Sequence, residues 1–230
     1  SFVLTAYGCT NNQTLSVTVY PTPVLSSLLL TAATCSEQPF VYTPSFAVAN
    51  TTYSWTRAAV SGVTPASSNG TGVGLNETLI NSNATTTNVT YLFTMTANSC
   101  NNQQSVVVPV YPNLTLNSVL SAPAICNGTT FSYTPTSQVS GVNFSWSRAS
   151  ISGITPATSS GTSSISEVLN NTTTAPITVT YAYTLTANGC SKTTNITVVV
   201  KPTPVLNSPL TGIVCNNAPF NYTATSATVG

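Results

Sequence analysis

Apolar and polar side chains alternate along most of this chain. In residues 177–187 every second side chain is apolar, from Ile177 to Leu185, and the side chains between them are threonine or alanine. An extended strand with this period turns one face to a core and the other to water. Residues 89–97 follow the same alternation, and no stretch has a convincing helical period. We therefore expect an all-β fold.

The alternation and the turn signals between apolar runs predict the strands of residues 112–201. Dipeptides such as Asn127-Gly128 and Asn188-Gly189 mark the turns. Six or seven short antiparallel strands in about 90 residues are typical of an immunoglobulin-like sandwich rather than a closed barrel. We expect these strands near 113–120, 129–135, 142–149, 151–156, 163–169, 177–187 and 193–200.

The chain also repeats itself. Cys9, Cys100 and Cys190 end three versions of one strand motif, and Trp55 and Trp146 lie 91 residues apart. A fixed period of this size indicates tandem modules. We predict two whole modules, the first at 21–111 and the second at 112–201. They are flanked by the last strands of a preceding repeat in 1–20 and the first strands of a following repeat in 202–230.

Prolines follow the last strand of each repeat. They occur in Tyr20-Pro21, Tyr111-Pro112 and Lys201-Pro202. Proline fixes its own backbone angle and restricts the residue before it to extended geometry, so one module runs into the next with little slack. A flexible linker would be longer and rich in glycine and serine. We therefore expect the modules to form a stiff, extended rod.

Charged side chains are very scarce. They make up 3% of the chain, where about 25% is usual, and the formal net charge is +1. There is no basic stripe that could neutralise phosphates, so we expect no nucleic-acid partner. The longest apolar runs, such as 196–200, are too short to cross a bilayer, and we expect no membrane insertion by this segment.

The composition also removes the usual catalytic groups. The chain has no histidine and no aspartate, and its acids are Glu37, Glu77 and Glu167. A Ser-His-Asp triad or a histidine-rich zinc site cannot be built from these residues, and calcium wants several carboxylates. We predict that the protein is not an enzyme and has no catalytic residue, metal site or cofactor.

Six cysteines in a tandem β chain point to an oxidising, extracellular setting. One regular scheme pairs Cys35 with Cys100 and Cys126 with Cys190, and leaves Cys9 and Cys215 for repeats outside this stretch. The other pairs neighbouring modules as Cys9–Cys35, Cys100–Cys126 and Cys190–Cys215. We favour the first scheme, because its separations of 65 and 64 residues resemble the spacing that joins the two sheets of an immunoglobulin-like sandwich.

Two further pairs of residues recur in register. Trp55 and Trp146 occur in the middle of predicted strands, and we expect them in the core, with a sugar-stacking surface as the alternative. Arginine and glutamate recur 20 and 19 residues apart in the two modules. This recurrence predicts one ion pair in each module, although two solvated side chains in repeats of common origin would give the same pattern. The expected pairs are Arg57 with Glu77 and Arg148 with Glu167.

Several runs of the second module, taken in order, match a known pattern. They are residues 124–129, 131–135, 144–147 and 178–190, and the run closes on Val-Val-Val-Lys-Pro-Thr-Pro at 198–204. The chain resembles the PKD-like repeats of giant surface proteins from Bacteroidota bacteria. This resemblance implies tandem immunoglobulin-like sandwiches in secreted, surface-attached proteins, commonly adhesins exported by the type IX route. It implies no catalytic residues.

Three hypotheses about function follow. The first is a stiff, disulfide-stabilised spacer in the stalk or fibre of a very long secreted bacterial adhesin, located at the cell surface and contacting neighbouring repeats of the same chain. The second is a carbohydrate- or surface-binding module that presents Thr/Asn-rich sheet faces to surface polysaccharide. The third is association of identical chains into a filament, which near-zero net charge permits.

Overall fold

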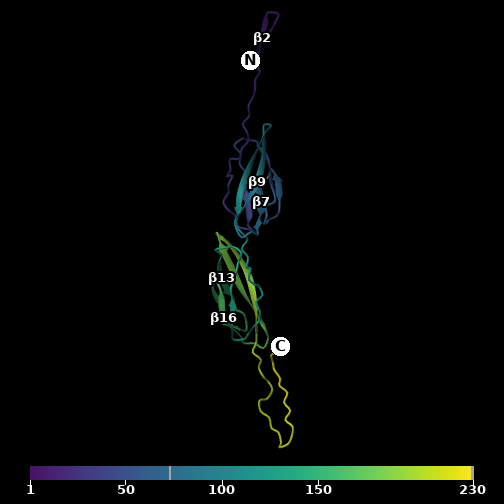
Figure 1. Cartoon of the computed structure of the whole chain (residues 1–230), viewed down its shortest axis with the longest axis vertical. Helices are drawn as coiled ribbons and strands as arrows, with labels where there is room; N and C mark the ends of the chain where they lie inside the picture. Colours follow the sequence, from purple (N-terminus) through teal and green to yellow (C-terminus); the bar gives the residue numbers. More distant parts are fainter. Residues whose placement is uncertain (73, 229–230) are drawn as a thin grey trace. The chain divides into compact units, whose positions relative to one another are not determined.

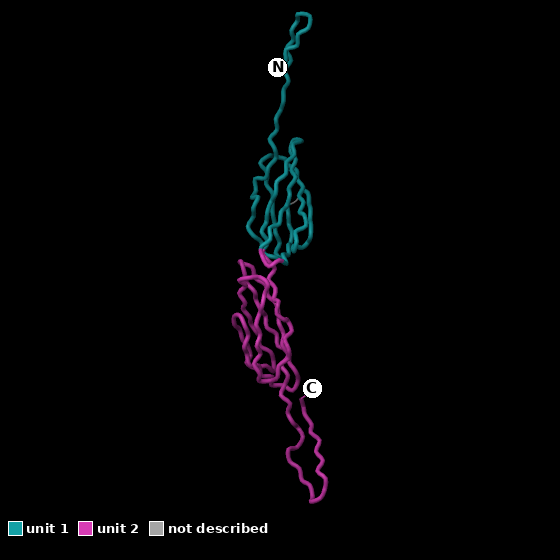
Figure 2. Tube along the Cα trace, in the orientation of Figure 1, with its two compact units in different colours: residues 1–82, 86–110 teal, residues 83–85, 111–230 magenta. Residues whose placement is uncertain are grey.

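The described part of the chain, residues 1–72 and 74–228 of the computed structural model, consists of strands and loops without a helix (Figure 1). No helix there could span a membrane. The chain divides into two compact units, residues 1–82 with 86–110 and residues 83–85 with 111–230 (Figure 2). The expected all-β, immunoglobulin-like fold is confirmed, since each unit contains one sandwich of mainly antiparallel sheets.

The described residues of the first unit form ten strands. Its larger sheet has the order β10-β9-β4-β6, and two small pairs, β3 with β7 and β5 with β8, form the rest of the sandwich. The strands are β1 (Phe2–Ala6), β2 (Cys9–Gln13), β3 (Pro39–Tyr42), β4 (Thr52–Arg57), β5 (Val63–Thr64), β6 (Ser68–Thr71), β7 (Leu75–Thr78), β8 (Ile80–Asn81), β9 (Thr87–Ala97) and β10 (Cys100–Val110).

The second unit repeats this plan. One sheet has the order β11-β18-β17-β13-β15, and the other has the order β12-β16-β14. The single strand β16 takes the place of β7 and β8. The strands are β11 (Ile125–Cys126), β12 (Thr129–Tyr133), β13 (Asn143–Arg148), β14 (Ile154–Thr155), β15 (Ser159–Thr162), β16 (Ile165–Asn171), β17 (Ile177–Ala187) and β18 (Cys190–Lys201).

The period-two pattern buries one face of each long strand. In β9 the side chains of Val89, Tyr91, Phe93 and Met95 are 0% exposed, while the threonines between them point outward. The rings of the opposite sheet complete the core, with Phe40 stacked on Tyr91 at 5.9 Å between ring centroids. Each large apolar side chain that is fully buried stabilises the fold by roughly 1.5–3 kcal/mol, so this alternation is the main source of stability.

Tight hairpins connect the two longest strands of each module. The turn residues between β9 and β10 are Asn98 and Ser99, with φ of 48° and 64°, and those between β17 and β18 are Asn188 and Gly189, with φ of 52° and 77°. Two successive positive φ angles are typical of a type I′ turn, which matches the twist of the flanking strands. The cysteine that follows each turn therefore opens the second strand of its hairpin.

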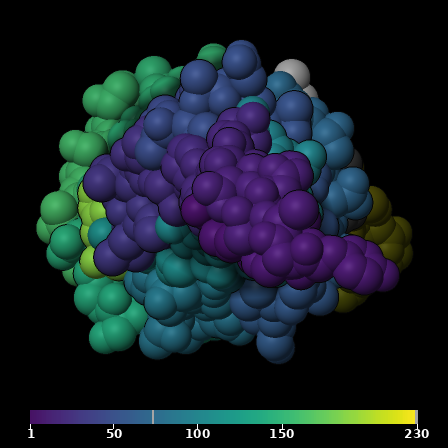
Figure 3. Space-filling model, turned by 90° about the horizontal axis from the view of Figure 1, so that it is seen from above, coloured from purple at the N-terminus to yellow at the C-terminus, as the bar shows by residue number. Residues whose placement is uncertain are grey.

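The chain termini carry shorter pieces of the same plan. The strands β1 and β2 form a hairpin whose residues are all exposed (Figure 3). Near the other terminus the Ser208 hydroxyl lies 2.6 Å from the Tyr222 hydroxyl. The same contact joins Ser27 to Tyr42 in the first module, at 2.6 Å, and Ser118 to Tyr133 in the second. Residues 205–226 thus repeat the local structure with which each whole module begins.

Candidate functional site

One arginine and one glutamate of each module are brought together inside its core. Arg57 extends from β4 and Glu77 from β7, and the Arg57 Nη2 atom donates to Glu77 Oε1 at 2.6 Å. In the second module Arg148 Nη2 donates to Glu167 Oε1 at the same distance. The arginine side chains are 0% exposed and the glutamate side chains 8%. The structure thus joins both predicted pairs, and it buries them.

Each ion pair belongs to a larger hydrogen-bonded network. Arg148 Nε donates to Glu167 Oε2 at 3.1 Å, so the pair is bidentate, and the same oxygen accepts from the Tyr181 hydroxyl at 2.6 Å. Arg148 Nη2 also donates to the backbone oxygen of Pro156 at 2.8 Å, and Nη1 donates to that of Ala157 at 3.1 Å. Every polar atom of the pair therefore has a partner within the protein, as a buried charge requires.

The first module repeats the network atom for atom. Arg57 makes a bidentate pair with Glu77 and donates to the backbone oxygens of Pro65 and Ala66, and the Tyr91 hydroxyl donates to Glu77 Oε2 at 2.5 Å. The tyrosine in this network was not predicted from sequence. It occupies an inward position of a strand, where the period-two pattern explains its burial without requiring a polar partner.

The network fixes the protonation states of its members. Burial works against ionisation of Glu167, but hydrogen bonds from Arg148 and Tyr181 outweigh it and lower the pKa of this carboxyl. The hydrogen bond to Glu167 raises the pKa of Arg148. Burial and the neighbouring carboxylate raise the pKa values of Tyr91 and Tyr181. A general acid or base needs a pKa near the working pH, and these shifts move the groups away from it.

The two tryptophans lie in the core beside the networks. Trp55 is 7% exposed and Trp146 is 9% exposed, and each ring meets a neighbouring tyrosine edge-on at 5.6 Å. Gly70 lies against the Trp55 ring, where an added Cβ would come within 2.8 Å of the indole. A ring enclosed in this way has little surface to offer a sugar. The indole N–H groups of both tryptophans are buried without an acceptor.

The cysteine pairing that we favoured from the sequence is wrong. Cys35 and Cys190 are disulfide-bonded, whereas Cys100 and Cys126 are free thiols. The alternative scheme fails as well, because Cys9 and Cys215 are also free.

The geometry of one module explains why its own cysteines do not pair. Thr34, next to Cys35, bridges Val110 at the end of β10, whereas Cys100 is the first residue of that strand. Ten residue steps along a strand separate the two ends by about 33 Å, and a disulfide needs Cα atoms within about 7 Å. In the second module Cys126 pairs with Lys201, at the far end of β18 from Cys190.

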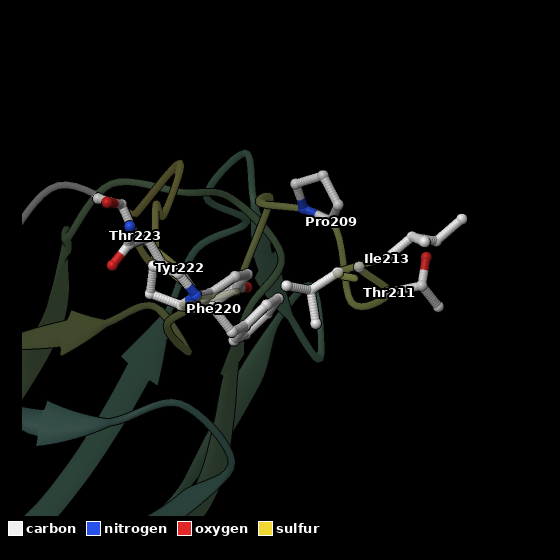
Figure 4. Close-up of a pocket in the computed structure, with 10 residues that line it drawn as sticks. Pro209, Thr211, Ile213, Phe220, Tyr222 and Thr223 are labelled. Carbon is white, nitrogen blue, oxygen red and sulfur yellow. The ribbon is translucent and has the colours of Figure 1, made fainter. Parts of the chain in front are cut away.

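A groove lies in the C-terminal piece of the chain. It measures about 530 Å³ and is lined by residues that include Pro209, Ile213, Phe220 and Tyr222 (Figure 4). Phe220 is 61% exposed and Tyr222 is 46% exposed. Their counterparts in the whole modules are core rings that pack against rings of β9 and β17. The groove is therefore the open core face of a partial module, and we assign it no ligand.

The residues that the structure describes hold no group of three or more cysteine or glutamate side chains that could bind a metal ion.

A buried asparagine is another polar feature that both modules share. Asn81 Nδ2 donates to the Val110 oxygen at 2.9 Å, and Asn171 Nδ2 donates to the Val200 oxygen at the same distance. These asparagines hold the end of the last strand in place. Their spacing in the sequence matches the repeat, which is the signal that could have identified them.

A family model described as a PKD-like domain matches residues 123–204. This stretch of the second module is therefore similar to PKD-like domains. Domains of this kind are typically structural or binding modules, and no catalytic family is found. No curated protein gives a match.

Solved structures with a similar strand arrangement are tandem immunoglobulin domains. The DIP-gamma IG1+IG2 structure has 10% identity and a TM-score of 0.34, and the match covers 78% of this chain and 98% of that one. The titin fragment I67-I69 has 9% identity and a TM-score of 0.33, with 83% and 69% covered. The N-terminal four Ig domains of Dscam1 have 12% identity and a TM-score of 0.32, with 77% and 45% covered. No property is transferred from similarities this low.

Proposed function

We propose that this chain is part of a stiff stalk or fibre in a long, secreted, surface-attached adhesin, where its modules act as spacers. The observation that carries the proposal is what the two modules have in common. Both repeat the same aromatic core and the same buried network of arginine, glutamate and tyrosine. The repeated features are those that stabilise a module.

The outward faces repeat less well, which favours a spacer over a binding module. Leu92 in β9 corresponds to Ala182 in β17, and Gln103 in β10 corresponds to Thr193 in β18. A binding surface built from tandem modules would need the same side chains at equivalent positions to form equivalent subsites.

Many outward hydroxyl and amide groups are also already engaged. Gln103 Nε2 donates to Thr94 Oγ1 at 3.0 Å, and the Thr184 and Thr193 hydroxyls lie 3.2 Å apart. Such cross-strand pairs stabilise a sheet. A polysaccharide would have to break these bonds, or compete with them, to bind the same atoms. We therefore place carbohydrate binding second.

The remaining support comes from charge and redox chemistry. Arg57, Glu77, Arg148 and Glu167 are committed to the cores, so few charges remain for specific recognition of charged partners. Disulfide-bonded cysteines are typical of oxidising compartments. Both features suit an extracellular polymer segment at the cell surface, with neighbouring repeats of the same chain as its constant partners.

Deletion of residues 112–201 from the native full-length protein tests the proposal. Antibodies to tags at the two ends of the protein, applied to intact cells, measure the separation of the ends by electron microscopy. If the modules are spacers, the shortened protein should still be labelled on intact cells, and its two ends should lie closer together by the length of one module. Attachment of the cells through other parts of the protein should be retained. Labelling only after permeabilisation, or an unchanged separation, contradicts the proposal. Loss of polysaccharide binding on deletion would favour the binding module instead.

A further inference from the structure

The cysteines of the repeats fall into two classes by their place in the sandwich. The hairpin class, Cys9, Cys100 and Cys190, immediately follows the tight turn of a two-stranded hairpin. The sheet-end class consists of Cys35, Cys126 and Cys215. In the whole modules a sheet-end cysteine lies beside the last residues of the same hairpin's second strand. Each whole module thus has one cysteine of each class, at opposite ends of one long strand.

This arrangement excludes a bond within a module. The two ends of β18 are about 36 Å apart, from eleven residue steps of strand, and the strand is held straight by eleven register pairs with β17. No side-chain rotation closes such a gap. A cysteine of either class that forms a disulfide must therefore find its partner outside its own module.

The bonded cysteines include one member of each class. Cys35 belongs to the sheet-end class and Cys190 to the hairpin class, and both are disulfide-bonded. Cys126 is the counterpart of Cys35, and Cys100 is the counterpart of Cys190, yet both are free thiols. The same local structure therefore holds a bonded cysteine in one module and a free cysteine in the other.

We propose that a directional rule joins these modules covalently: each disulfide links the sheet-end cysteine of one module to the hairpin cysteine of the module that follows, as the positions of the bonded Cys35 and Cys190 suggest. Under this rule Cys100 and Cys126 are the bonding points for the adjoining modules of the full-length protein, Cys126 toward the module that follows and Cys100 toward the one that precedes. The rule concerns connectivity between modules and does not depend on the role of the stalk.

The chemistry of each bond is ordinary thiol oxidation. The two thiols together lose two protons and two electrons, and one S–S bond forms. The electrons pass to a low-molecular-weight disulfide by thiol–disulfide exchange, which reduces that oxidant to two thiols. In the laboratory, oxidised glutathione supplies this oxidant.

The first test uses the 230-residue chain. The chain is oxidised with glutathione, its free thiols are alkylated, and it is digested without reduction by trypsin and chymotrypsin. Chymotryptic cleavage after Leu116 or Leu120 separates the Cys100 peptide from the Cys126 peptide. The rule predicts alkylated Cys100 and Cys126, and a Cys35 peptide linked to the Cys190 peptide. A Cys35 peptide linked to any other cysteine, or alkylated Cys35, overturns the rule.

The second test gives Cys126 an adjoining module. A second copy of residues 112–201 is inserted after residue 201, and exposed changes Thr130→Ser and Ser191→Thr in the added copy distinguish its peptides by mass. The rule predicts that Cys126 becomes linked to the hairpin cysteine of the added copy, and that changing this cysteine to serine restores alkylation of Cys126. Changing Cys215 to serine is the matched control and should have no effect. A Cys126 thiol that stays free in the extended chain contradicts the rule.

Discussion

Replacement of Arg148 by methionine should destabilise the second module by about 3–5 kcal/mol, the range found when one partner of a buried ion pair is removed. Methionine keeps much of the aliphatic packing of the arginine but removes the cation that pairs with Glu167. The Glu167 side chain is only 8% exposed, and the Tyr181 hydroxyl would be its remaining strong donor. The backbone oxygens that Arg148 also binds belong to the exposed residues 156 and 157, so water replaces that contact. The unpaired carboxylate therefore dominates the loss.

Urea denaturation followed by tryptophan fluorescence measures this effect. A Trp55→Phe background leaves Trp146 as the reporter, so the signal describes the second module alone. With a urea m-value of about 1 kcal/mol/M, the midpoint should fall by about 3 M or more. The matched control is Lys201→Gln, which removes an exposed charge from the same module and should change the free energy of unfolding by less than about 0.5 kcal/mol.

A double variant separates the charge from the packing. Arg148→Met combined with Glu167→Gln removes both charges and keeps an acceptor for the Tyr181 hydroxyl, so most of the lost stability should return. A cost below about 1 kcal/mol for the single variant would place the pair among weak exposed ion pairs and refute the reasoning. A double variant as unstable as the single one would equally refute it, because the loss would then come from packing.

Three other expectations concern the second module. The pKa of Glu167 is lowered in the fold, so the stability that its carboxylate contributes is complete above its ordinary pKa near 4.5 and should be lost as the pH falls through the lower folded pKa. Urea midpoints measured between pH 7 and pH 3 test this loss. Midpoints that do not change with pH contradict it. Gly161→Ala should cost about 1–3 kcal/mol, since its Cβ would lie 2.8 Å from the Trp146 ring, whereas Ser160→Ala, at an exposed position of the same strand, should be nearly neutral by thermal unfolding. Asn171→Ala should cost about 1–3 kcal/mol in the same assay, because the buried backbone oxygen of residue 200 loses its donor; an unchanged midpoint would contradict that role.

The sequence predicted the core strands best, because burial on one face leaves a clear period. The expected strand 177–187 coincides with β17, and 142–149 differs from β13 by one residue at each end. The strand β15, Ser159–Thr162, was missed because its residues are small and polar and it forms at the sheet edge only through backbone pairing with β13. The expected strand 113–120 does not form a ladder, and its contacts are isolated hydrogen bonds.

Sequence reasoning identified the ion pairs of the candidate site correctly but not the disulfide-bonded cysteines. Recurrence at equivalent positions identified the residues of both ion pairs. In a chain with so few charged residues, a charge that occurs in both modules indicates a structural role. The disulfide prediction failed because separation along the chain does not say which end of a sandwich a residue reaches. Cys100 and Cys35 are 65 residues apart in sequence and lie at opposite ends of β10. Hairpin register, which the structure supplies, was the missing information.

The central claim is that these modules form a stiff spacer, and small-angle scattering on chains of two, four and six whole modules tests it most directly. The chains repeat residues 112–201 in register, so that each junction is the Lys-Pro step from Lys201 to the Pro112 of the next copy. The account predicts that the maximum dimension grows in proportion to the number of modules. Growth closer to the square root of that number, as flexible linkers would give, would contradict it.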